Sequence, residues 1–179
     1  MAIISNPAVF LDRDGVIIHE KDFIIDPDKL EFIPGSLDAL KRIPPSYKKI
    51  IVSNQSGIGR GYFTANQVER FNDVLLARIK KYGASIDKIY YCPHTPEDNC
   101  NCRKPKPGLF EKARQQFNID FSGSWMIGDK SSDIRAGKNI GAATILVLTG
   151  YGGKERNSLD VAADYVVNNL YEAVEIIKS

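Results

Sequence analysis

Two aspartates separated by one residue, Asp12 and Asp14, follow a short apolar run at residues 8–11. The run is typical of a buried strand, so both carboxylates stand where that strand should end. Alternate side chains of an extended chain point the same way, so the pair can face one site. A carboxylate can be a nucleophile, and two close together need a cation to relieve their repulsion. The pair therefore indicates metal-assisted phosphoryl transfer through an aspartyl-phosphate, although turns and calcium loops use the same residues.

A second acidic segment, G-D-K-S-S-D at residues 128–133, also follows an apolar run. We expect Asp129 to bind Mg²⁺ rather than to cap a helix, together with the carboxylate of Asp12 and the backbone carbonyl of Asp14. Magnesium prefers a few carboxylates, several waters and substrate phosphate. Asp133 lies one helical turn further on, and it either supports this site or is a solvated helix residue.

Hydroxyl and amide groups follow the apolar run at residues 49–52, in the sequence S-N-Q-S-G. Such a loop can hold phosphate oxygens. The glycines at residues 57–61 have G-x-G-x-G spacing, which lacks the third glycine of a dinucleotide fingerprint, so we reject that interpretation. Arg60 can bind a remote anionic group, unless its loop is simply a flexible turn. The residues expected to contact substrate here are Ser53, Asn54, Gln55, Ser56 and Arg60.

A basic stretch, R-K-P-K-P-G at residues 103–108, precedes a predicted helix. Lys104 can neutralise the charge that builds on a transferring phosphoryl group. Cations gain nothing from the dipole at a helix N-terminus, so an anion between them explains the stretch better than a stiff surface loop does.

Three cysteines and one of the two histidines gather within eleven positions. Three thiols and an imidazole fill a tetrahedral zinc shell and leave no position for water, which predicts a structural Zn²⁺ site. Buried packing is a poor alternative because two of the thiols lie in a polar loop, and a disulfide across one intervening residue would be strained. The expected ligands are Cys92, His94, Cys100 and Cys102.

Alternating strand and helix patterns must position these groups. Strands are expected at residues 8–11, 49–52, 88–91, 125–127, 144–148 and 165–167, and helices at 36–43, 64–82, 107–117, 131–139 and 170–177. The alternation predicts an α/β fold, a Rossmann-like parallel sheet with helices on both faces. Ligands bind such sheets beyond the carboxyl ends of the strands, so the segments above should meet at one edge.

The bulk properties set further limits. A length of 179 residues suits one α/β domain, and we expect residues 1–179 to form a single domain. Lysine plus arginine number 24 and aspartate plus glutamate 22, and this balance favours neither nucleic acid nor membrane as a partner. No apolar run approaches the ~18 residues of a membrane helix. The N-terminal stretch lacks the regions of a signal peptide, so we expect a cytoplasmic monomer that acts on a small phosphorylated substrate.

The order and spacing of these motifs carry a resemblance. D-x-D-G-V at residues 12–16, Ser53-Asn54, Lys104 and G-D-x-x-x-D at 128–133 resemble the four motifs of haloacid dehalogenase-superfamily phosphatases. The segment 54–63, the Cys/His loop and R-K-P-x-P-G are similar to the D-glycero-D-manno-heptose 1,7-bisphosphate phosphatase family. The related histidinol-phosphate phosphatase domain shares the Cys/His loop and R-K-P-K. The S-G-I-x-R-G segment favours the heptose branch.

The resemblance implies a role for each matching residue. Asp12 would be the nucleophile and Asp14 the general acid/base. Ser53 and Lys104 would stabilise the phosphoryl group. Arg103 would recognise substrate, and Lys130 and residues 20–23 would lie near it. Ser53 replaces the usual threonine and keeps the hydroxyl. Residues 18–23 depart from the family pattern, which leaves the sugar and anomer open.

The resemblance also bears on the overall architecture. Superfamily cap domains are inserted after the first or second motif. The gap from Asp14 to Ser53 holds a loop and one short predicted helix, and the gap from Ser53 to Lys104 holds one helix, one strand and the Cys/His loop. We therefore expect a haloacid dehalogenase-like fold with no cap domain, and an open site partly roofed by the zinc-binding loop.

Charge indicates the substrate. Arg60, Arg103, Lys106 and Lys130 are more cations than one phosphate needs, and a second, non-reacting phosphate would give them a purpose. We therefore expect a sugar bisphosphate, and the resemblance implies that it is heptose 1,7-bisphosphate losing its C7 phosphate. Histidinol phosphate is the alternative, although these cations would repel its amine. A catalytically silent module that binds phosphorylated ligands is the alternative from another class.

Overall fold

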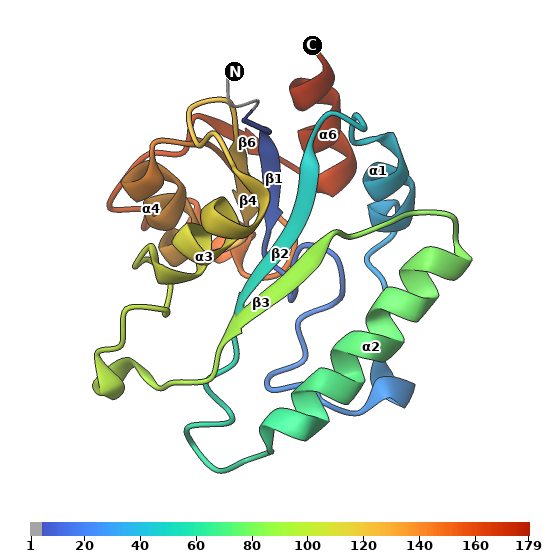
Figure 1. Cartoon of the computed structure of the whole chain (residues 1–179), viewed down its shortest axis with the longest axis vertical. Coiled ribbons are helices and arrows are strands. Elements are labelled where there is room, and N and C mark those ends of the chain that lie inside the picture. Colours follow the sequence, from blue (N-terminus) through green and yellow to red (C-terminus); the bar gives the residue numbers. More distant parts are fainter. Residues whose placement is uncertain (1–4) are drawn as a thin grey trace.

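One six-stranded parallel sheet organises the computed structural model, which describes residues 5–179 (Figure 1). Residues 1–4, part of the stretch in which we expect no signal peptide, lie outside the described residues. The strand order is β3-β2-β1-β4-β5-β6, as in Rossmann-like sheets. The strands are β1 Ala8–Leu11, β2 Lys48–Asn54, β3 Lys88–Cys92, β4 Trp125–Gly128, β5 Ala143–Val147 and β6 Tyr165–Val167.

Helices connect the strands as the alternating pattern predicts. The α-helices are α1 Ser36–Arg42, α2 Ala65–Lys81, α3 Gly108–Phe117, α4 Ser131–Ile140, α5 Gly152–Glu155 and α6 Leu170–Lys178. No sequence pattern predicts α5 or the two 3₁₀ turns, Pro27–Lys29 and Pro96–Asp98. Each of these three elements spans only about one turn, which is too short for an apolar repeat to show.

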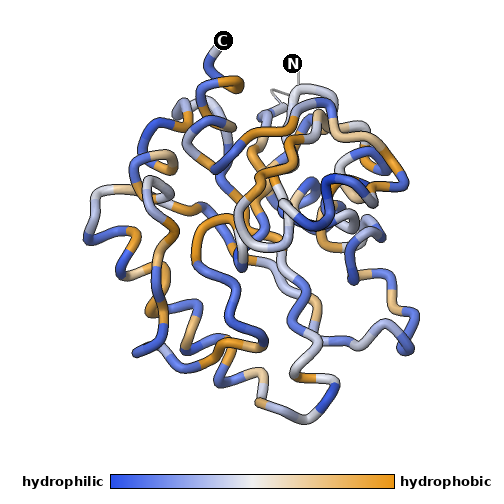
Figure 2. The backbone as a smooth tube through the Cα atoms, turned by 180° about the vertical axis from the view of Figure 1, so that it is seen from behind, coloured by the Kyte–Doolittle hydropathy of each residue, from blue (hydrophilic) through white to orange (hydrophobic). Residues whose placement is uncertain are grey.

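The two faces of the sheet bury separate cores. On β1, Val9 and Leu11 pack with residues of α1, α2 and α6, whereas Ala8 and Phe10 pack with residues of α3 and α4. This alternation follows from the two-residue period of a strand. Figure 2 shows the apolar segments gathered in the middle of the molecule, with alternating hydropathy along the surrounding helices. The predicted α/β class with helices on both faces is confirmed.

Strand ends differ from the expected ranges at one place that matters for the site. β2 continues through Ser53 and Asn54, because these residues pair with Tyr91 and Cys92 of β3. Both side chains are therefore set by the sheet rather than by a loop. Gln55 follows directly, and its backbone N–H donates to the carbonyl of Cys92 at 2.8 Å.

The connections explain where a site can form. The chain crosses from β3 at one edge of the sheet back to β4 beside β1, so the loops after β1 and β4 leave in opposite directions and open a crevice.

Between residues 14 and 104, all of which are described, the chain adds only the elements given above, so the expected lack of a cap domain is confirmed. Among residues 5–179, every helix is too short or too polar to traverse a bilayer.

Candidate active site

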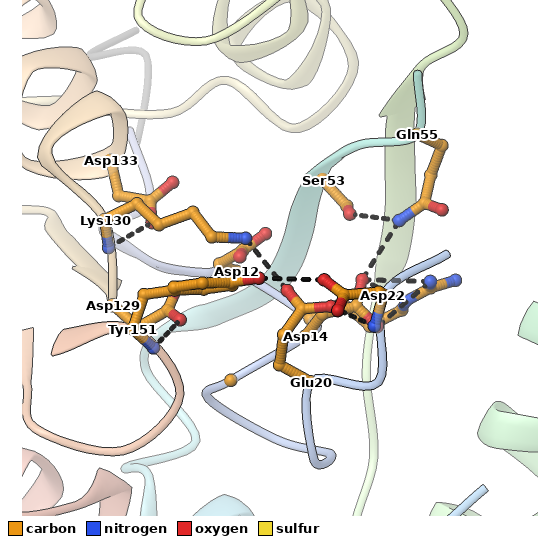
Figure 3. A network of polar contacts seen from close by, with 12 residues as sticks. Asp12, Asp14, Glu20, Asp22, Ser53, Gln55, Asp129, Lys130, Asp133 and Tyr151 are labelled. Atoms are coloured by element: carbon orange, nitrogen blue, oxygen red, sulfur yellow. Dashed lines mark hydrogen bonds and ion pairs between the residues drawn. The ribbon is translucent and has the colours of Figure 1, made fainter. Parts of the chain in front are cut away.

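A cleft of about 330 Å³ lies beyond the carboxyl ends of β1, β2 and β4. Its walls come from segments far apart in the sequence, which Figure 3 shows converging around Asp12. Of the predicted site residues, those lining it are Asp12, Asp14, Ser53, Asn54, Gln55, Ser56, Arg103, Lys104 and Lys130. The structure thus brings together the segments that the sequence pattern placed at one edge.

Three carboxylates form an acidic cluster at the base of this region. Oxygens of Asp12, Asp129 and Asp133 all lie within 4.8 Å of one another, and all three side chains are buried. Asp12 follows β1 and Asp129 follows β4, so their proximity results from the parallel pairing of these two neighbouring strands. Such a set of hard oxygen donors matches what Mg²⁺ binds in proteins.

Asp129 has the environment of a metal ligand. It is fully buried, and its Oδ1 has no hydrogen-bond partner among the described residues. Burial, with the negative charges of Asp12 and Asp133, raises the pKa of Asp129 to about 8. A Cβ on Gly15 or Gly150 would collide with this carboxylate, and both glycines have left-handed backbones, so the close approach needs glycine. Asp129 does not cap α4; the Asp133 carboxylate accepts from the Lys130 backbone N–H instead.

Lys104 is the cation within the acidic cluster. Its Nζ lies 2.9 Å from Oδ1 of Asp12 and 2.7 Å from Oδ1 of Asp133, and it donates to the carbonyl of Val52 at 2.6 Å. Burial opposes ionisation of Asp12, but the ammonium groups of Lys104 and Lys130 hold its pKa below the ordinary value. Asp133 is 1% exposed, so it is a buried partner of Lys104 and not a solvated helix residue.

Asp14 is held by two donors on the other side of the cleft. Arg13 Nε donates to Asp14 Oδ2 at 3.0 Å, and Gln55 Nε2 donates to the same oxygen at 3.1 Å. The Arg13 guanidinium is almost completely buried, donates to Oδ1 of Asn72 on α2 and lies over the ring of Phe71. The orientation of Asp14 therefore depends on α2, which packs beside the loop after β1.

The polar residues at the end of β2 contact different parts of the site. Gln55 Nε2 also donates to Oγ of Ser53 at 2.7 Å, so one amide connects Ser53 with Asp14. Asn54 exchanges two hydrogen bonds with the backbone of Lys104, at 3.0 and 3.2 Å. Asn54 thus holds the lysine segment in place, and because it also lines the cleft, its predicted contact with substrate stays a prediction.

Two of the four cations counted from the sequence do not line the cleft, so the structure supports the charge argument for the other two alone. Arg60 is exposed and does not line the cleft, because its loop packs back on Pro93 and Thr95. Lys106 donates to the carbonyl and side chain of Asn99.

The other two cations do line the cleft. Lys130 is paired with Glu20 at 2.9 Å. Among the cations that line the cleft within residues 5–179, Arg103 alone has no carboxylate in salt-bridge contact.

The Cys/His loop forms a compact donor cluster. The three Sγ atoms lie 3.2–3.5 Å apart, and Nδ1 of His94 lies 3.2 Å from Sγ of Cys102. A tetrahedral zinc with bonds of about 2.3 Å separates its sulfurs by roughly 3.8 Å, so the donors are nearly in place. Arg103 donates to the carbonyl of His94 at 3.2 Å, which connects this loop to the cleft.

Comparisons with known proteins agree with this geometry. A HAD-hydrolase-like family model matches residues 101–173. The chain is 38% identical to the D-glycero-beta-D-manno-heptose-1,7-bisphosphate 7-phosphatase of Helicobacter pylori J99, over 98% of this chain and 99% of the relative. The enzyme of the same name from Escherichia coli O6:H1 is also 38% identical, over 97% and 95%. This chain belongs to the heptose bisphosphate phosphatase family.

Solved structures extend the comparison. The heptose bisphosphate phosphatase from B. bronchiseptica, crystallised with magnesium and phosphate, superposes with a TM-score of 0.88 and 31% identity, over 96% of this chain and 98% of that one. The phosphatase from Burkholderia thailandensis gives a TM-score of 0.74 and 27% identity, over 97% and 99%. Family membership thus confirms the resemblance carried by the sequence motifs.

Sequence reasoning missed several members of this heptose bisphosphate phosphatase site. No motif predicts a role for Arg13, which stands between the two aspartates, or for Asn72, which lies within the predicted helix at residues 64–82. A signal for Asn72 existed, since it lies four residues after Val68 on the buried face of α2. Tyr151, which lines the cleft after β5, had no recognisable motif.

Proposed function

We propose that this chain is a Mg²⁺-dependent phosphatase that removes the C7 phosphate of D-glycero-β-D-manno-heptose 1,7-bisphosphate through an aspartyl-phosphate. The observation that carries the proposal is the buried ion pair of Asp12 with Lys104 beside two further carboxylates. The names of the 38%-identical relatives supply the sugar, the anomer and the position of the phosphate.

The acidic cluster fits the metal ion. Asp12 and Asp129 would hold Mg²⁺ through carboxylate oxygens and Asp14 through its backbone carbonyl, with Asp133 supporting them through Lys104. The unpaired Oδ1 of buried Asp129 supports this assignment, because such an oxygen is costly without a cation. When bound, Mg²⁺ supplies electrostatic stabilisation of the phosphoryl oxygens.

The residues of the chain then carry two steps. A carboxylate oxygen of Asp12 attacks phosphorus, the bond to the C7 oxygen breaks, and Asp14 gives that oxygen its proton. Asp14 then takes a proton from a water molecule that attacks the phosphorus of phospho-Asp12, which releases inorganic phosphate and restores the carboxylate. Lys104 and Ser53 stabilise the phosphoryl oxygens throughout, and Gln55 and Arg13 hold Asp14 between the steps.

Zinc would have a structural role. The cluster of Cys92, His94, Cys100 and Cys102 offers four protein donors and so leaves no position for substrate. Its loop ends at Arg103 and Lys104, so ordering the loop would fix both cations at the cleft.

Substrate preference tests the proposal. Arg103 lines the cleft and forms no salt bridge with a carboxylate of residues 5–179. It is therefore the cation best placed for the non-reacting phosphate. Histidinol phosphate stays the competing substrate, because Glu20 and Asp22 also line the cleft and a carboxylate can receive an amine. We expect kcat/KM for the heptose bisphosphate to exceed that for histidinol phosphate at least about tenfold, a difference of about 1.4 kcal/mol. Preference for histidinol phosphate would overturn the sugar, and inactivity on both and on a generic phosphomonoester would favour a silent binding module.

A further inference from the structure

One wall of the cleft is built from residues 20–23, and its backbone conformation is disfavoured. Asp22 has a φ of 40° and Phe23 a φ of 60°, so two successive residues that are not glycine adopt the left-handed region. Such a conformation persists only where surrounding contacts hold it. Glu20, Asp22 and Phe23 all line the cleft, so whatever holds this segment also sets the shape of the site.

Tyr151 closes a ring of contacts around this segment. Its hydroxyl donates to Oδ1 of Asp22 at 2.8 Å, and the Asp22 backbone N–H donates to Oε1 of Glu20 at 3.1 Å. The other Glu20 oxygen accepts from Lys130 Nζ at 2.9 Å, and that ammonium lies 4.7 Å from the centre of the Tyr151 ring. Figure 3 shows the side chains of Lys130 and Tyr151 reaching across to Glu20 and Asp22, with a dashed line marking each contact.

The backbone of Tyr151 is fixed to the acidic cluster. Its N–H donates to Oδ2 of Asp129 at 2.8 Å. Two residues earlier, the hydroxyl of Thr149 donates to the carbonyl of Gly15 at 2.6 Å. Gly150 lies so close to Asp129 that a Cβ there would collide with the carboxylate, so this turn has little room to shift. Tyr151 therefore connects the acidic cluster, through Asp129, to residues 20–23, whose backbone conformation depends on surrounding contacts.

We propose that Tyr151 is a positioning residue whose hydroxyl holds residues 20–23 in the conformation that binds the sugar part of the substrate. The proposal rests on the proposed function for the identity of the substrate. Because the hydroxyl touches neither Asp12 nor Asp14, it contributes to substrate affinity and not to phosphoryl transfer. A wall that is already ordered binds its ligand without a further loss of conformational freedom, and this gain is lost when the wall is released.

Tyr151→Phe tests this assignment, because it removes the hydroxyl and retains both the ring under Lys130 and the backbone N–H to Asp129. We expect KM for the heptose bisphosphate to rise about three- to tenfold, the range of one hydrogen bond, with kcat within about twofold. KM for p-nitrophenyl phosphate, which lacks the sugar, should not change. In the protein without ligand, amide hydrogen exchange of residues 20–23 should become about three- to tenfold faster, in step with the lost contact.

Two controls sharpen the test. Tyr165→Phe changes an exposed tyrosine on β6 that does not line the cleft, and it should leave KM and exchange unchanged. Asp22→Ala removes the acceptor, so combining it with Tyr151→Phe should add little further exchange beyond either change alone.

The outcomes separate this inference from the proposed function. Unchanged exchange of residues 20–23 in Tyr151→Phe would overturn the positioning role, whatever the substrate. A loss of kcat with unchanged KM would overturn it too. Absence of wild-type turnover on the bisphosphate would contradict the proposed function alone, because the exchange measurement needs no substrate.

Discussion

Nζ of Lys104 lies 2.9 Å from Oδ1 of Asp12, and the two residues are only 3% and 5% exposed. Lys104 follows the Cys/His loop and Asp12 follows β1, so this contact joins segments about ninety residues apart. Asp133 completes the arrangement on the other side of the ammonium. One buried cation thus stands between two carboxylates, and the charge of each group depends on the others.

Replacing Lys104 by methionine should lower kcat on a generic phosphomonoester by about 100-fold or more, because the phosphoryl oxygens lose a preorganised cation. Steady-state kinetics at saturating Mg²⁺ measure the loss, and circular dichroism checks the fold. Lys112→Met, on the exposed surface of α3, is the matched control and should retain full activity. A Lys104→Met enzyme with more than half of wild-type kcat would contradict the assigned role.

Arg13→Lys should impair protonation of the leaving group, because lysine retains the charge but not the paired hydrogen bonds to Asp14. We expect kcat to fall about tenfold on a sugar phosphate, the loss expected when a general acid is displaced. The loss should be smaller on p-nitrophenyl phosphate, whose leaving group needs no proton. Asn72→Ala should show the same substrate pattern more weakly, since it acts through Arg13. Equal losses on both substrates would show that Arg13 does not act through Asp14.

Asp129 should make the stability of the metal-free protein depend on pH. Its folded-state pKa is raised to about 8, so between pH ~4 and ~8 the folded chain binds more protons than the unfolded chain. Stability should therefore fall as pH rises through this window, on the order of 1 kcal/mol per pH unit.

Denaturant unfolding in EDTA at pH 5 and pH 7.5 measures this effect. Asp129→Asn removes the titrating group, so the difference between variant and wild type isolates its contribution. Added Mg²⁺ should restore the wild type at pH 7.5 and leave the variant unchanged. The opposite slope, or a variant that responds to Mg²⁺ as the wild type does, would rule out Asp129 as the ligand.

Cys100→Ser should remove bound zinc and destabilise the protein, because a three-donor shell binds more weakly and the loop loses its order. Metal analysis should give about one zinc per chain for the wild type, as a single closed site requires. We expect a lower melting temperature and a higher KM for the bisphosphate, since Arg103 is hydrogen-bonded to the backbone of His94. Purified wild-type protein without zinc, or a variant of unchanged stability, would end this interpretation.

Local patterns predicted the elements well and their arrangement in part. Apolar runs located the strands, and the polar residues after them located Asp12 and Asp129. The position of β4 beside β1 is a non-local pairing that no local pattern encodes, and only the general rule for α/β sheets brought the two aspartates together.

Side-chain direction was the part that sequence could not supply. Counting cations assigned Arg60 and Lys106 to the substrate, but their loops fold toward the Cys/His loop. Arg13 and Asn72 meet only because α2 packs beside the loop after β1. Tyr151 lies in a short turn without a motif, so its contact with Asp22 could not be foreseen.

The most direct test of the central claim follows both phosphorus atoms of D-glycero-β-D-manno-heptose 1,7-bisphosphate by ³¹P NMR, with Mg²⁺ and purified protein. We predict that the C7 phosphate signal disappears, that inorganic phosphate appears in equal amount and that the anomeric phosphate stays. Asp12→Asn, folded as the wild type, should leave both signals unchanged. Loss of the anomeric phosphate, no reaction with the wild type, or turnover by Asp12→Asn would contradict the account.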